Sequence, residues 1–308
     1  MPQPAATPFL KSPVFTGILF GVAAYTCWGL SPLYFRAASM MTPLELNAQR
    51  VLWAFLLCLG LVAATGKLAL FGRVLRDRRL LAVLCLTAGL MLTNWLIFVY
   101  AIDRQQVMAV SLGYYINPLV AVLLGRIVLK ERVSPLQWGL LGLVAAGVLV
   151  LVAAAESSVW LSLLIAFSWG FYALQRKRFP VDSLVGFTIE VMLLLPLALG
   201  YLAWHGGGAL AQIAQAAGEA RPWLGLLGLI LLSGLVTTVP LVAFGAGQRR
   251  LTLASMGLLQ YISPSLQFLL AVLLWGESFR LHHAIAFGCI WIAVIFYSLE
   301  NWRRLRAR

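Results

Sequence analysis

The sequence YYINP at residues 114–118 returns in a related form, QYISP, at residues 260–264. Each copy places its proline near the middle of a long apolar segment, and a glutamate follows each proline after 13 residues, at Glu131 and Glu277. Many transporters build their substrate site from matching interrupted helices in two duplicated halves. The paired motifs therefore predict a duplicated helical membrane protein.

Composition places most of the chain in lipid. Of its 308 residues, 62% are hydrophobic and 11% are charged, whereas a soluble domain carries about 25% charged residues. Only helices and closed barrels satisfy their backbone polar groups inside a bilayer, and continuous apolar runs exclude alternating barrel strands. We expect an all-α membrane protein with ten transmembrane helices. The predicted spans are 14–35, 45–65, 80–101, 108–129, 134–153, 157–176, 183–204, 223–248, 253–275 and 281–300.

The net charge of +13 predicts an orientation rather than a nucleic-acid partner. With the N-terminus in the cytoplasm, 18 of the 23 lysines and arginines fall on the cytoplasmic side. This bias follows the positive-inside rule, and ten crossings then place both termini in the cytoplasm. We expect the lipid bilayer and a small-molecule substrate as partners, expect no nucleic acid, and leave a homodimer open.

The ten segments divide into two five-helix repeats, at residues 14–153 and 157–300. Because five is odd, the second repeat enters the membrane from the opposite face, and a pseudo-two-fold axis in the membrane plane relates the two. The pair Trp28-Gly29 in the first segment has a weak echo in Trp169-Gly170 in the sixth. We expect the substrate where the repeats meet. The simple alternative is that duplication only enlarged the bundle.

Prolines inside the segments predict a polar cavity near the membrane midplane. A proline removes its own N–H and frees the carbonyl four residues earlier, which lipid cannot satisfy. We predict helix breaks at Pro118, Pro264 and Pro240. Aromatic and polar side chains at similar depth predict the cavity walls, although packing between helices would also explain each of them. The predicted cavity residues are Tyr25, Trp28, Asn94, Trp95, Tyr114, Tyr115, Asn117, Trp169, Gln260 and Tyr261.

Ionisable residues inside the segments are costly unless they are paired or hydrated, so they are candidates for function. Glu190, in the seventh segment, is predicted to be a proton-coupling carboxylate or half of an inner gate, with Arg126 as its partner. Arg50, in the second segment, is predicted to contact Glu45 or Gln49 in a gating, coupling or purely structural role.

Other residues indicate neither a cofactor nor enzyme chemistry. The four cysteines, at positions 27, 58, 85 and 289, lie in apolar spans without paired spacing and are expected to be free thiols. Histidines and aspartates fall near span ends or in loops, so we expect no metal, no cofactor and no catalytic site. Glu131 and Glu277 are expected to cap the N-terminus of the next helix. A non-transporting sensor or assembly factor remains the alternative function.

The chain resembles the EamA family of the drug/metabolite transporter superfamily. The likeness rests on the two five-helix repeats, the Trp28-Gly29 pair, and the proline and glutamate of both motifs. Several stretches resemble its RarD-type branch: RVLW at 50–53, NWLIF at 94–98, SLGYYINP at 111–118, TTVPL at 237–241 and GLLQYISP at 257–264. The resemblance implies a multi-pass permease of the bacterial inner membrane, with a central cavity lined by both halves. We expect a secondary carrier that exports small organic metabolites or drugs.

Overall fold

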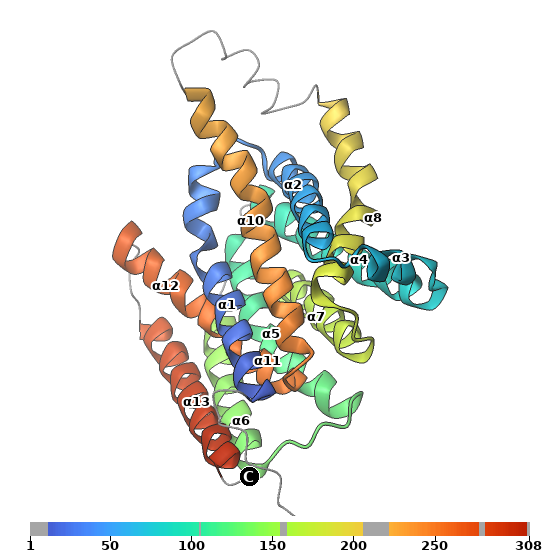
Figure 1. The fold of residues 1–308 in the computed structure, drawn as a ribbon. Helices are drawn as coiled ribbons and strands as arrows, with labels where there is room; N and C mark the ends of the chain where they lie inside the picture. The colour runs from blue at the N-terminus through green and yellow to red at the C-terminus, as the bar shows by residue number, and fades with distance from the viewer. Residues whose placement is uncertain (1–11, 105, 155–158, 206–221, 277–280, 307–308) are drawn as a thin grey trace, which may run out of the picture.

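The computed structural model describes residues 12–104, 106–154, 159–205, 222–276 and 281–306, and this part of the chain is helical without strands (Figure 1). The first half contains α1 (Pro13–Ala37), α2 (Pro43–Ala64), α3 (Leu68–Arg76), α4 (Arg78–Asp103), α5 (Val107–Ile127) and α6 (Pro135–Ala154). The second half contains α7 (Val159–Arg178), α8 (Ser183–Trp204), α10 (Pro222–Gln248), α11 (Leu253–Leu259), α12 (Ile262–Trp275) and α13 (Leu281–Arg306).

Short polar side chains set where several helices begin. Ser12 Oγ accepts a hydrogen bond from the backbone N–H of Phe15 at the start of α1, at 3.1 Å. Thr42, Asp182 and Thr252 cap α2, α8 and α11 in the same way. These oxygens satisfy backbone donors that have no partner within the first helical turn.

Eight segments of the described chain are long and apolar enough to cross a membrane. They are α1, α2, α4, α5, α6, α8, α10 and the α11–α12 pair. The other two predicted spans form α7 and α13. Serines and the terminal basic residues make α7 more polar, and α13 contributes a shorter apolar stretch at 284–296. The chain is a multi-pass helical protein, while ten crossings and the side of each terminus stay predictions.

The contacts between the two halves follow a symmetric pattern. Replacing each helix by its equivalent in the other half leaves the pattern unchanged. Helix α1 packs on α10, and its equivalent α7 packs on α4. Likewise α1 contacts α12, while α7 contacts α5. Equivalent helices also pair with each other: α2 with α8, α5 with α11, and α6 with α13, the last pair lying side by side in Figure 1. Contacts of this kind indicate a pseudo-two-fold relation between the halves.

The two Trp-Gly pairs lie at equivalent helix crossings. A Cβ atom on Gly29 would lie 2.7 Å from Leu266 Cβ, and one on Gly170 would lie 2.7 Å from Val120 Cγ1. Val120 and Leu266 are themselves 146 residues apart, the spacing of the proline motifs. The repeated glycine therefore permits the same close crossing of the first helix of each half with the fourth helix of the other.

The predicted helix breaks are only partly correct. Between α11 and α12 the chain is interrupted just before Pro264, where Ser263 N donates to the Gln260 carbonyl in a tight turn at 3.0 Å. In contrast, Pro118 and Pro240 lie inside the uninterrupted helices α5 and α10. A single proline removes one backbone hydrogen bond, and neighbouring turns with packed flanks can continue the helix across it.

Candidate functional site

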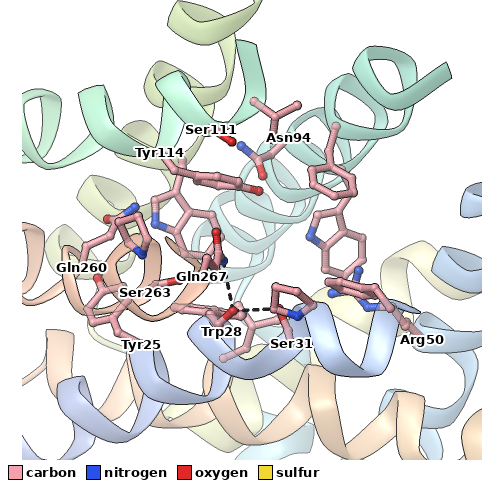
Figure 2. A pocket seen from close by; sticks show the side chains of 18 of the residues that line it. Tyr25, Trp28, Ser31, Arg50, Asn94, Ser111, Tyr114, Gln260, Ser263 and Gln267 are labelled. Carbon is pink, nitrogen blue, oxygen red and sulfur yellow. Dashed lines mark hydrogen bonds between the residues drawn. The ribbon is translucent and has the colours of Figure 1, made fainter. Parts of the chain in front are cut away.

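A cavity of about 310 Å³ lies between the two halves, with walls from α1, α2, α4, α5, α7, α10 and the α11–α12 segment. Figure 2 shows its labelled side chains surrounding a central hollow. Among the wall residues Ser111 is exposed, whereas Tyr25 and Trp169 are buried. The size and the apolar walls with a few polar groups are typical of a small-molecule site.

An aromatic cluster forms the buried floor of this cavity. The rings of Trp28 and Trp169, the equivalent tryptophans of the two halves, meet edge to face with centroids 5.4 Å apart. Trp169 also stacks on Tyr172 at 5.0 Å and contacts Phe244 at 5.2 Å. Such arrangements are favourable for aromatic pairs, and they make a rigid floor.

Pro32 leaves a backbone carbonyl at the same wall without its helical hydrogen-bond donor. Pro32 lies inside α1 and cannot donate to the carbonyl of Trp28. That oxygen instead accepts hydrogen bonds from Ser31 Oγ at 2.7 Å and from Gln267 Nε2 at 3.2 Å, as Figure 2 shows. Gln267 lies on α12, so the freed carbonyl joins the two halves at the cavity wall.

Arg50 lies on the opposite side of the hollow from Gln260 (Figure 2). Its Nε donates to Thr237 Oγ1 and its Nη1 to Asn47 Oδ1, both at 2.9 Å. The predicted partners Glu45 and Gln49 do not make these bonds. Asn47 precedes Arg50 by three residues and so shares its helix face, whereas Gln49 Oε1 accepts from Trp53 Nε1 at 3.1 Å.

Glu190 is fully buried beside the aromatic floor and has three polar neighbours. Thr87 Oγ1 donates to its Oε1 at 2.6 Å, and the Tyr172 hydroxyl donates to Oε2 at 3.2 Å. Its cationic partner is Arg176, with Nη1 3.6 Å from Oε1.

This pairing corrects the prediction for Arg126, which is exposed on α5. The short connection between α7 and α8 brings Arg176, near the end of α7, back to Glu190 on α8. A side chain at Gly186 would collide with the Arg176 guanidinium, so this glycine makes room for the ion pair.

More charged contacts close the same end of the bundle. Lys177 Nζ donates to the carbonyls of Gln248, at 2.9 Å, and Leu251. Asp182, ahead of α8, pairs with Lys67 at 2.8 Å and with Arg249 at 3.7 Å. Partial burial alone would raise the pKa of Asp182, but Lys67, the Val185 N–H and Arg249 together hold that pKa below its ordinary value. The ionised carboxylate is therefore the stable form at this end.

Beyond the aromatic floor lies a seam too narrow to hold a water molecule. Among the described residues, neither side-chain polar atom of Asn117 has a hydrogen-bond partner, and Gln248 Oε1 also lacks one. Both side chains line the seam and are almost completely buried. Leaving such groups unpaired is costly, and here they lie in a dry seam whose other walls are mostly apolar.

Most of the predicted cavity residues lie together, and three do not. Tyr115 packs against Phe287 with ring centroids 5.7 Å apart, and the Tyr261 hydroxyl donates to the Tyr115 carbonyl at 3.1 Å. Asn117 lines the seam instead of the cavity. Neighbouring residues on a helix point about 100° apart, so they cannot all face one hollow. The cavity is lined by the predicted residues Tyr25, Trp28, Asn94, Trp95, Tyr114, Trp169, Gln260, Pro264 and Arg50.

Sequence reasoning missed three polar residues at these sites. Arg176 belongs to a basic cluster at the end of its span, which the positive-inside rule explains without further function. Thr237 lies one turn before Pro240 in the TTVPL stretch, and the sequence of that stretch does not single it out. Gln267 is a polar residue within an apolar run, three residues after Pro264, and that isolation was a usable signal.

Glu131 has the expected capping role on an unexpected helix. Its carboxylate oxygens accept hydrogen bonds from the backbone N–H groups of Leu253, at 2.7 Å, and Ala254, at 3.2 Å. The capped helix is α11 in the other half, rather than the next helix, α6. Glu277, its counterpart, lies outside the described residues.

Comparisons with known proteins agree with this architecture. The model of the EamA-like transporter family matches the chain twice, at residues 15–153 and 156–299. An uncharacterized transporter of Vibrio cholerae is 40% identical over 92% of this chain and 92% of its own. The chloramphenicol-sensitive protein RarD of Pseudomonas aeruginosa is 36% identical over 94% of this chain and 96% of its own.

A solved crystal structure shares the fold at 20% identity, with a TM-score of 0.69 over 94% of this chain and 98% of its own. Both family matches cover the helices that enclose the cavity, and the RarD relatives span nearly the whole chain. The chain therefore belongs to the EamA-like transporter family, with RarD proteins among its relatives.

Proposed function

We propose that this membrane transporter is a secondary carrier that moves small organic metabolites or drugs across the bacterial inner membrane by alternating access. The central cavity is its substrate site. The observation that carries the proposal is the position of the cavity: equivalent residues of the two halves, Trp28 and Trp169, meet in its floor. A site at such a junction can be exposed to either side as the halves rock.

The dry seam supports this mechanism because it is the repeat image of the cavity. It lies across the aromatic floor, and Tyr25, Trp169 and Gln260 border both. Four further seam residues are equivalents, 146 positions away, of residues that line the open cavity. The pairs are Asn117 with Ser263, Ala121 with Gln267, Met256 with Val110, and Gly257 with Ser111.

In this mechanism, the seam opens while the cavity closes, and the reverse. The unpaired amide of Asn117 and the carbonyl oxygen of the Gln248 side chain gain water or substrate contacts when the seam opens. Their burial without partners raises the free energy of the closed seam, which keeps the open arrangement within reach.

The Glu190–Arg176 pair acts as part of the gate at the closed end. Sequence reasoning left proton coupling and gating open for Glu190. Three polar neighbours stabilise its carboxylate, and Lys177 joins α7 to the end of α10 at the same level. The ion pair ties α7 to α8 at the closed end, and this link between helices supports the gating role.

We propose export as the direction of transport. Solute counterflow in proteoliposomes tests the carrier function itself. The panel contains amino acids, nucleosides, carboxylic acids and amphipathic drugs, chloramphenicol included, each with and without a proton gradient. We expect saturable exchange of at least one class. Saturable binding without exchange for every class would instead identify a sensor or an assembly factor.

A further inference from the structure

Arg50 is the only charged side chain that lines the central cavity, considering the residues that the structure describes. None of the ion pairs in this part of the chain includes Arg50. Its two hydrogen-bond partners, Thr237 and Asn47, are neutral. A partly buried cation without a counter-ion is unfavourable. The Arg50 guanidinium would therefore attract an anion that enters the cavity.

The guanidinium is also held in a fixed orientation. Its Cζ lies 4.7 Å from the centre of the Trp95 ring, and Thr237 and Asn47 fix Nε and Nη1. Stacking occupies the face of the guanidinium and leaves part of its edge, including Nη2, without a described partner. An arginine edge binds a planar carboxylate through parallel hydrogen bonds.

We propose that Arg50 is the substrate-recognition residue of the cavity and that the substrate is a small organic carboxylate with an apolar or aromatic body. This inference rests on the proposed carrier function, since it assigns a ligand class to the same site. Trp28, Trp95 and Tyr114 supply flat walls for the body of the ligand. Asn94 and Gln260 add neutral hydrogen-bonding groups on other sides of the hollow (Figure 2).

The cavity chemistry disfavours the other charge classes. No aspartate or glutamate of the described chain lines the cavity, so a cationic drug would meet Arg50 without a compensating carboxylate. A zwitterion would gain one ion pair and leave its ammonium group with neutral partners. A monoanion matches the single positive charge.

Matched ligands that differ only in charge test the inference. Purified protein in lipid nanodiscs is titrated with phenylacetate and with phenylacetamide, and binding is followed by intrinsic tryptophan fluorescence and calorimetry. We expect the carboxylate to bind roughly 10- to 100-fold more tightly, because it makes charge-assisted hydrogen bonds that the amide lacks. Equal affinities for the two compounds would overturn the inference.

Variants separate substrate recognition from a structural role. Arg50→Gln should remove the preference for the carboxylate while leaving amide affinity nearly unchanged, and Arg50→Lys should keep part of the preference. Arg73→Gln, an exposed arginine of α3, is the control and should retain all of it. If Arg50→Gln folds and still prefers the carboxylate, Arg50 only packs helices. If that variant fails to fold, two other single variants, Arg50→Lys and Asn47→Leu, replace it. A preference for the carboxylate that is unaltered in both of them overturns the inference.

Two outcomes distinguish this inference from the carrier function. Exchange of neutral compounds in proteoliposomes without any preference for carboxylates would remove the anion site and leave the carrier intact. Carboxylate-selective binding without exchange would keep the anion site and remove the carrier.

Discussion

Individual residues decide whether a charge inside the membrane is tolerated, and Glu190 is the clearest case. Its side chain is fully buried, and Arg176 beside it is 4% exposed. Removing one member of such a pair leaves the other buried without compensation, which costs more than removing both. Stability measurements can therefore detect the pair even before transport is assayed.

We predict that Glu190→Gln lowers the free energy of unfolding by about 3–5 kcal/mol, because it leaves the Arg176 charge unpaired. The double variant Glu190→Gln, Arg176→Met should regain much of that loss. Thermal unfolding of the purified single and double variants measures the coupling. Additive losses would mean that the two side chains do not interact, and a lost pH dependence of transport in Glu190→Gln would favour proton coupling over gating.

At the residue level, the sequence could indicate positions where depth in the membrane alone was decisive. Trp28, Asn94 and Trp95 could be placed near the cavity because they lie at midspan beside other polar or aromatic groups. The partner of Glu190 could not, since Arg126 and Arg176 lie near the ends of neighbouring spans. Choosing between them requires the rotation of each helix, which packing against the whole bundle determines.

At the scale of helices, close crossings between the halves depend on the repeated Trp-Gly pair. Gly29 of α1 meets α12, and Gly170 of α7 meets α5, at equivalent positions. The repeat of the Trp-Gly pair is visible in the sequence. Its packing role is not, because that role depends on the contact of each glycine with the opposite half. The apolar runs, in contrast, predicted the helices directly, since backbone groups in lipid have few alternatives.

We predict that Gly170→Ala costs about 1–3 kcal/mol of stability, because the added methyl group overlaps Val120. A second substitution, Val120→Ala, should recover much of the loss. Gly60→Ala in α2 is the matched control, since a Cβ there meets nothing within 4 Å. Thermal unfolding of the three variants provides the test, and an equal effect of the two glycine substitutions would contradict the role of this crossing.

At the scale of the whole molecule, the proposed alternating access requires the cavity and the seam to exchange roles. The duplication and the meeting of the two proline motifs could be predicted from 146-residue spacing, and the structure brings Tyr261 into contact with Tyr115 across that spacing. Which surface is open could not be predicted. In the proposed mechanism both arrangements satisfy the same sequence, and their balance depends on small differences between two packed states.

Locking the seam tests this claim most directly. A Cβ on Gly257 would lie 3.0 Å from Ala121 Cβ, near enough for a disulfide after a small shift. The variant Ala121→Cys, Gly257→Cys is made without the four native cysteines, and counterflow is measured in oxidised and reduced proteoliposomes. We predict that the oxidised protein still binds ligand but does not exchange it, and that reduction restores exchange. Full exchange by the cross-linked protein would contradict alternating access through the seam.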